Sequence, residues 1–173
     1  MSHPAPPVIE TERLLLRRLH ADDAEFIFEL VNDPDWLRYI GDKGVKTLDD
    51  ARNYIRTGPM EMYERFGFGL LMVESKEGGT PIGICGLLKR DTLDDVDIGF
   101  AFLPAFRAQG YAREAAAATL AYAKGVLNLG RVIAITATDN HDSARLLEKL
   151  GLRFESMQPS AGEQDLRVFA ISF

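Results

Sequence analysis

The segment between residues 104 and 115 constrains the fold more than any other part of the chain. An apolar run over residues 96–103 leads into it and is stopped by Pro104, and an alanine-rich helical pattern follows over residues 115–124. From Pro104 to Arg113, the chain between them holds one glycine, Gly110, and no acidic residue. A loop that opens directly into a helix leaves the first backbone N–H groups of that helix without intrahelical partners. These donors, with the positive end of the helix dipole, favour a bound phosphate or pyrophosphate.

Two arginines strengthen this interpretation. Arg107 and Arg113 bring positive charge to the loop, and Gly110 lets a bulky anion approach the backbone closely. The spacing is neither that of a P-loop nor that of a G-x-G-x-x-G dinucleotide turn. Taken alone, the same residues also fit an ordinary strand–turn–helix with solvated arginines. The rest of the chain must decide between the two.

Length and charge limit the classes of protein that fit. A chain of 173 residues predicts one domain with a sizeable core. The net charge of −6 argues against a nucleic-acid partner, which requires a basic surface, so any polyanion site must be locally basic. No apolar run approaches the length of about 18 residues that a membrane helix needs, and the proline-rich polar start is not a signal peptide. We therefore expect no membrane partner and a cytoplasmic location.

Cysteine and histidine usage predicts neither a disulfide nor a metal site. Cys85 is the single cysteine and lies in an apolar alternating run, where it is expected to be a buried core residue. The histidines, His3, His20 and His141, have no metal-ligand spacing.

Hydrophobic periodicity predicts a flexible tail over residues 1–8 and a single domain over 9–173. Strands are expected at 12–19, 68–73, 82–88, 96–103, 131–137, 152–156 and 166–173. Helices are expected from Asp22 to residue 32, from Thr47 to Arg65 with an interruption at Gly58–Pro59, over 110–127, and from Asn140 to Leu150. The resulting order is β-α-α-β-β-β-α-β-α-β-β.

Two motifs within this order resemble one family. Arg107-x-x-Gly110-x-Ala112 resembles the Q/R-x-x-G-x-G/A signature of the GNAT superfamily of acyl-CoA-dependent N-acetyltransferases. Residues 140–152 resemble the N-x-x-S-x-x-L-L-E-K-L-G-F segment of that family, with a leucine in place of the final phenylalanine. The element order is also that of the GNAT fold, so the resemblance covers residues 10–173.

The opening segment narrows the resemblance further. Residues 10–19, E-T-E-R-L-L-L-R-R-L, resemble the first strand of the N-terminal acetyltransferases of ribosomal proteins. The resemblance implies an α/β (α+β) GNAT fold, with a mixed, mostly antiparallel sheet of six to seven strands and about four helices. It implies acetyl-CoA as cofactor, CoA as product, and an amine-bearing acceptor, either a protein N-terminus or a small molecule. The protein is expected to be a monomer or a homodimer.

The family resemblance also implies a cofactor site. The backbone N–H groups of residues 108–112 would clamp the pyrophosphate, and the strand before them would pair with the pantetheine arm. The implied cofactor-binding residues are Phe102, Leu103, Arg107, Ala108, Gln109, Gly110, Tyr111, Ala112, Asn140 and Ser143.

Two residues are candidates for catalysis. Asp97 matches the acidic position of the family's E-I-G segment and is the candidate base that accepts the amine proton, directly or through water. The alternative is that Asp97 faces solvent on the polar side of its strand. Ser143 would donate a hydrogen bond to the sulfur of the leaving thiolate, although a serine there also commonly bonds back to the helix cap.

The sequence is compatible with more than one kind of amine acceptor. An α-amine with a pKa of about 7.8 is neutral at pH 7 at a cost of about 1 kcal/mol, whereas a lysine-type amine costs about 4–5 kcal/mol. An α-amine therefore needs little help from a base. A polyamine or antibiotic is the alternative acceptor. A non-catalytic CoA-binding regulatory domain is the alternative class, because Leu147 stands where many family members carry a tyrosine acid.

Overall fold

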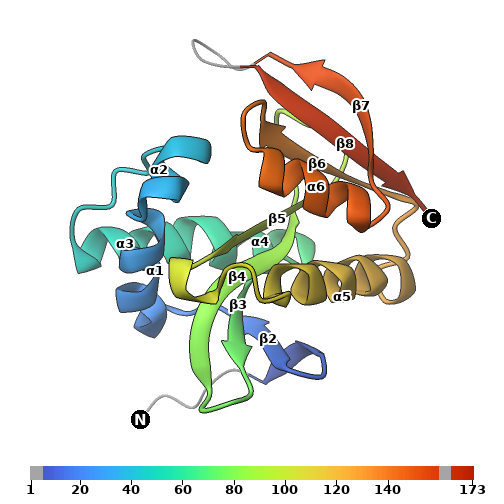
Figure 1. Ribbon diagram of the computed structural model, residues 1–173. Coiled ribbons are helices and arrows are strands. Elements are labelled where there is room, and N and C mark those ends of the chain that lie inside the picture. Colours follow the sequence, from blue (N-terminus) through green and yellow to red (C-terminus); the bar gives the residue numbers. More distant parts are fainter. Residues whose placement is uncertain (1–5, 160–164) are drawn as a thin grey trace.

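The structure, a computed structural model, describes residues 6–159 and 165–173. Within them the chain forms one eight-stranded sheet in the order β1-β2-β3-β4-β5-β6-β8-β7 (Figure 1). The strands are β1 (Pro7–Glu10), β2 (Leu14–Arg18), β3 (Leu70–Ser75), β4 (Thr80–Leu88), β5 (Asp97–Phe102), β6 (Arg131–Ala137), β7 (Arg153–Gln158) and β8 (Leu166–Ser172). All neighbours are antiparallel except β5 and β6, which are parallel.

Helices cover both faces of the sheet. They are α1 (Ala24–Val31), α2 (Pro34–Tyr39), α3 (Leu48–Ile55), α4 (Glu61–Phe66), α5 (Tyr111–Gly125) and α6 (His141–Lys149). The small residues of α5 pack with Leu71 and Val73 of β3 on one face, and α6 contributes to the same core. Helices α1 and α3 pack with Leu70 and Met72 on the other face. Successive β3 side chains therefore pack into the two cores alternately, because neighbouring side chains of a strand point to opposite faces of the sheet.

The predicted fold class is confirmed, with differences in element number. The described residues contain eight strands and six α-helices, not six to seven strands and about four helices. The additional strand β1 includes residues 7 and 8, so the predicted tail over 1–8 was too long; residues 1–5 lie outside the described part. Pro7 is the first residue of this edge strand, a position where proline costs no ladder bond. The predicted break at Gly58–Pro59 is a π-helical turn that joins α3 to α4.

Strands β5 and β6 share only one aligned pair, Asp97 with Ile133. By contrast, β4 and β5 share six pairs and β6 and β8 share seven. The Ile133 N–H donates to Val96 O at 3.0 Å, and beyond this point the two strands separate. The C-terminal half of β5 therefore has a partner on one side only, and the sheet opens between β5 and β6.

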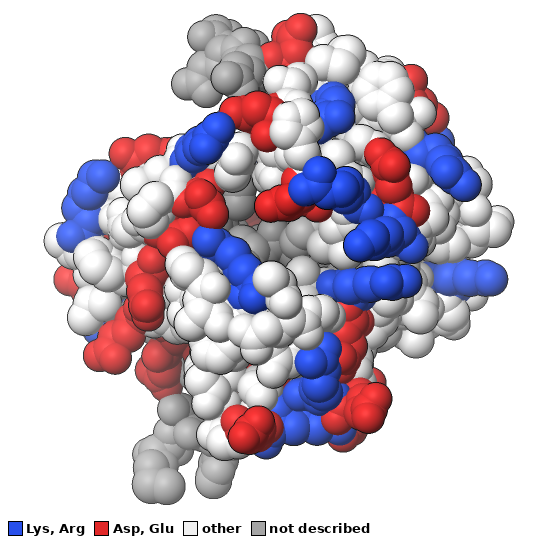
Figure 2. Space-filling view, in the orientation of Figure 1, with Lys and Arg blue, Asp and Glu red and all other residues white. Residues whose placement is uncertain are grey.

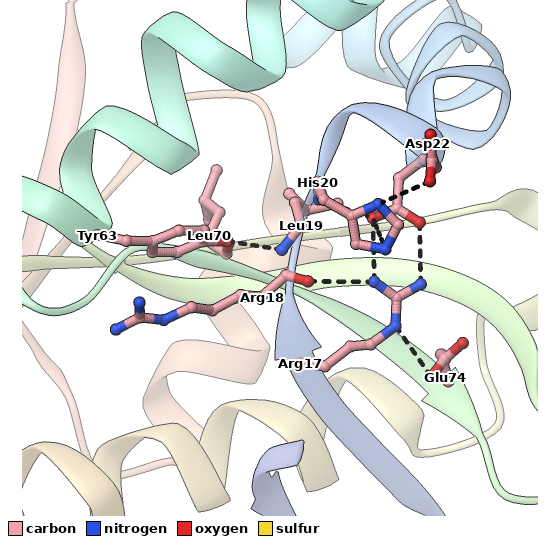
Figure 3. A network of polar contacts seen from close by, with 9 residues as sticks. Arg17, Arg18, Leu19, His20, Asp22, Tyr63, Leu70 and Glu74 are labelled. Carbon is pink, nitrogen blue, oxygen red and sulfur yellow. Dashed lines mark hydrogen bonds and ion pairs between the residues drawn. The ribbon is translucent and has the colours of Figure 1, made fainter. Parts of the chain in front are cut away.

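A buried ionic network fixes the start of the first helical segment (Figure 3). The guanidinium of Arg17 donates to both carboxylate oxygens of Asp23, at 3.0 and 2.9 Å, and its Nε lies 3.2 Å from Glu74. The His20 N–H also donates to Asp23. Burial alone would raise the pKa of Asp23, but the Arg17 and His20 hydrogen bonds outweigh burial and hold that pKa below its ordinary value.

Asp23→Asn is expected to lower the free energy of unfolding at pH 7 by about 3 kcal/mol, because it leaves a buried arginine with Glu74 as its one carboxylate partner. A depressed carboxyl pKa stabilises the fold above the unfolded-state pKa of about 3.9, so the difference from wild type should shrink as pH falls through about 4. Urea unfolding between pH 3 and pH 7 measures both effects. Asp22→Asn is the matched control, since Asp22 is 63% exposed. Equal loss in both variants would contradict this role.

Candidate active site

The N-terminus of α5 has no cap. Gly110, at φ 83°, precedes the helix without a side-chain cap, and Ala108 is also left-handed at φ 60°. No described residue accepts a hydrogen bond from the backbone N–H groups of residues 108–113. The N-termini of α3 and α6, by contrast, are capped by Thr47 and Asn140. The unpaired donors expected from the sequence are therefore present, and the dipole of a fifteen-residue helix adds to them.

Arg13, the residue just before β2, contacts this turn. Its Nη1 donates to Gln109 O at 3.1 Å, its Nε donates to Glu114 at 2.7 Å, and its guanidinium lies 4.3 Å from the Tyr111 ring centroid. A Cβ at Gly110 would lie 3.2 Å from Arg13 Nη2. No local motif marks Arg13 as a site residue, because in the sequence it is one position of the first-strand motif at residues 10–19.

Arg107 is not a free cation. Its terminal nitrogens donate to Asp33 and Asp35, each at 2.7 Å, and its Nε donates to Phe102 O at 3.0 Å. The positive charge that Arg107 was predicted to bring to the loop is thus compensated by two carboxylates from the start of α2. Arg113, in contrast, is exposed and has no ion pair among the described residues. It is the positive charge of this turn that remains available.

The turn borders the opening between β5 and β6. A hollow lies at the centre of the face drawn in Figure 2, over β5 and between α2 and the start of α6. Arg38 of α2 and Asp139, just before α6, form an ion pair at 3.2 Å across this hollow. The Leu103 N–H donates to Ile82 O of β4 at 3.0 Å. Because bonding alternates along an antiparallel strand, the Phe102 N–H points away from β4, toward the opening.

The start of α6 carries two more predicted residues. Asn140 Oδ1 accepts from the Ser143 backbone N–H at 3.2 Å, so the predicted helix cap is confirmed. The half-buried Ser143 hydroxyl has no partner in the described part of the chain, and the bond to the cap comes from its backbone instead. Leu147 is 1% exposed and packs in the core, so no side chain there donates a proton.

Asp97 lies at the closed end of the opening. It is 1% exposed, so the alternative of a solvent-facing carboxylate is wrong. Arg90 Nε contacts both of its oxygens, at 3.2 and 3.3 Å. Burial raises the pKa of Asp97 and outweighs the opposing charge and hydrogen bond of Arg90. Asp97 and Phe102 are five residue steps apart, about 16 Å along the strand.

Other candidate chemistry is not supported in the described residues. Cys85 is fully buried, as expected, and burial raises the pKa of its thiol to about 12, which keeps it protonated. Neither a cluster of metal-ligating side chains nor a helix long and apolar enough to cross a membrane occurs in residues 6–159 and 165–173.

The sheet opens between two parallel strands, and the uncapped N-terminus of α5 follows the free end of β5. Residues 13–153 match the family described as the acetyltransferase (GNAT) domain. The chain belongs to this family and is an acetyltransferase that acts on amine acceptors. Acetyl-CoA is the donor that GNAT acetyltransferases use, and it is the cofactor of this chain.

Related proteins agree with this assignment. An uncharacterized N-acetyltransferase of Bacillus subtilis, YoaA, is 31% identical over 153 residues, which cover 87% of this chain and 85% of the relative. The crystal structure of a GNAT-family acetyltransferase from Bacillus anthracis has a TM-score of 0.78 at 32% identity, covering 95% of this chain and 97% of that one.

Two more distant solved structures share the fold. They are the ribosomal-protein-S5-alanine acetyltransferase of Vibrio fischeri, at 18% identity, and the spermidine N-acetyltransferase of Vibrio cholerae with CoA and spermine, at 20%. Each has a TM-score of 0.77 and covers 94% of this chain, with 94% and 96% of those chains covered. At this identity the likeness shows the fold alone.

Proposed function

We propose that this acetyltransferase modifies an α-amine and that the turn after β5 holds the CoA diphosphate. The uncapped N-terminus of α5 carries the proposal, because six consecutive backbone N–H groups, those of residues 108–113, have no acceptor among the described residues. Acetyl-CoA supplies an acetyl group activated as a thioester. The residues proposed to bind it are Phe102, Leu103, Arg107, Ala108, Gln109, Gly110, Tyr111, Ala112, Asn140 and Ser143.

Asp97 is proposed as the base that takes the amine proton. Its burial and raised pKa make it a stronger base than an exposed carboxylate, and Arg90 holds it in place. An α-amine, which is easily deprotonated, suits a base of this strength better than a lysine side chain does. Protein N-termini and small molecules both offer such amines. Among proteins of the same fold, one acetyltransferase is named for a ribosomal protein and another for spermidine, whose amines are of the lysine type and not α-amines.

Release of CoA thiol from acetyl-CoA over a panel of amines tests the function. We expect turnover with α-amines of peptides or amino acids, and slower turnover with lysine side-chain amines. A protein that binds CoA tightly but acetylates no amine would instead be a regulatory CoA-binding domain, the class that the leucine at position 147 keeps open.

Ser143→Ala is expected to lower kcat by about tenfold and to leave the CoA dissociation constant within about twofold, since one hydrogen bond to the leaving sulfur is worth about 1.5 kcal/mol. The helix should remain intact, because its cap uses the Ser143 backbone N–H. Steady-state kinetics and calorimetric CoA titration separate the two effects. Ser156→Ala in β7 is a matched control. Equal losses of kcat and CoA affinity would reduce Ser143 to a binding residue.

A further inference from the structure

A second polar site lies at the Asp97 end of β5. A groove between α4 and the loop after β4 is lined by Thr57, Gly58, Glu61, Met62, Arg65, Phe66, Lys89, Arg90 and Asp91. We call it the basic groove, because three of its side chains are basic and two are acidic in a chain whose net charge is −6. None of these residues belongs to the turn proposed to hold the CoA diphosphate, which includes residues 108–110 and follows the opposite end of β5.

Arg90 joins the basic groove to the proposed base. Its Nε contacts both oxygens of Asp97, so both of its terminal nitrogens are left for another group. No described residue accepts a hydrogen bond from those nitrogens. The Arg90 side chain is 41% exposed, whereas Asp97 is 1% exposed. The arginine therefore presents donors to a ligand in the groove while it holds the carboxylate behind it.

A second arginine lines the same groove as Arg90. Arg65 lies over the Phe66 ring at 4.9 Å and has no ion pair among the described residues. Two guanidinium groups with free donors are suited to a carboxylate or phosphate, which they bind bidentately. A polycation would be repelled there.

We infer that the basic groove recognises an anionic group on the acceptor, and that the acceptor is an amine with a carboxylate near its amino group. This inference rests on the proposed function, because it places the amine at Asp97. An anion bound to the terminal nitrogens of Arg90 would lie on the other side of the guanidinium group from the Asp97 carboxylate. Free amino acids and peptides with an acidic residue next to the N-terminus share this chemistry, whereas spermine has no anionic group.

Matched acceptors test the inference. Acetyl transfer is measured with an amino acid and its C-terminal amide, with peptides carrying Asp or Asn at the second position, and with spermine. A carboxylate form should exceed its amide by about tenfold or more in kcat/KM, as expected for one charge-assisted pair. Preference within the amino-acid pair indicates a free amino acid, and preference within the peptide pair indicates a peptide. Arg65→Gln should reduce the preference to about twofold, while Arg153→Gln, an exposed arginine of β7, should leave it unchanged.

Binding provides a readout that is independent of turnover. The CoA-loaded protein is titrated with each acceptor by calorimetry, and we expect the carboxylate form to bind more tightly than the amide, a preference that Arg65→Gln reduces to about twofold. Equal binding and equal turnover of carboxylate and amide, or a preference that survives Arg65→Gln, would overturn the inference while acetyl transfer itself stands. Absence of all turnover with CoA bound would overturn the proposed function instead, and the titration would still decide whether the groove selects an anion.

Discussion

Gly110→Glu is expected to weaken CoA binding by at least a hundredfold. The residue is the left-handed N-cap of α5 and lies next to the unpaired N–H groups, so a glutamate there places a carboxylate beside the seat proposed for the diphosphate. A carboxylate about 4 Å from a phosphate, at an effective dielectric constant of about 20, costs about 4 kcal/mol. Every factor of ten in affinity corresponds to about 1.4 kcal/mol, so this repulsion alone exceeds the predicted loss. Calorimetric titration with CoA measures it.

The fold should survive this substitution. A non-glycine residue in the left-handed region costs about 1–2 kcal/mol, and Arg13, 3.2 Å from the new Cβ position, must shift. Gly79→Glu in the turn between β3 and β4 is the matched control, since Gly79 is also left-handed at φ 63° and a Cβ there meets nothing within 4 Å. We expect a small change in Tm in both variants, and a loss of CoA affinity in Gly110→Glu alone. Unchanged CoA affinity in folded Gly110→Glu would place the diphosphate elsewhere.

The features that the sequence predicted well depend on local chemistry. The Thr47 and Asn140 caps, the proline that stops β5, and the glycine before α5 are each determined by residues within a few positions of one another. The apolar strands followed from their alternation. Such signals predicted the order of the elements, and the resemblance to the GNAT family then implied the fold class. They also predicted the position of the uncapped helix, which is the part of the site that depends on backbone geometry.

The features that sequence analysis missed depend on contacts between distant residues. Arg13 and Glu114 are 101 positions apart, and Arg107 meets Asp33 across 74 positions. No local pattern shows that Arg107 is already paired, or that Arg13 instead reaches the turn before α5. Strand β1 is defined by its pairing with β2, not by its own proline-containing sequence. The alternative environments of Asp97 could be separated only once the fold showed that its side chain is buried.

Asp97→Asn is expected to lower kcat by about 10²–10⁴-fold, the range typical of a lost general base, without changing the CoA dissociation constant. The amide keeps the shape of the side chain but cannot accept the amine proton. In the wild type, kcat/KM should rise with pH as the carboxylate forms, at a pH above the ordinary value because burial raises the pKa of Asp97. This rise of kcat/KM with pH should be absent in Asp97→Asn. Asp94→Asn, an exposed neighbour, should behave as wild type.

Stability distinguishes a base from a structural carboxylate. A folded-state pKa above the unfolded value means that the folded chain binds more protons, so ionisation of Asp97 lowers the free energy of unfolding as pH rises between the two values. Asp97→Asn removes that buried charge, and Arg90 is exposed enough to be solvated without it. The variant should therefore be at least as stable as wild type at pH 7 while its kcat falls. A variant that unfolds more easily but retains kcat would show that Asp97 only holds Arg90 in place.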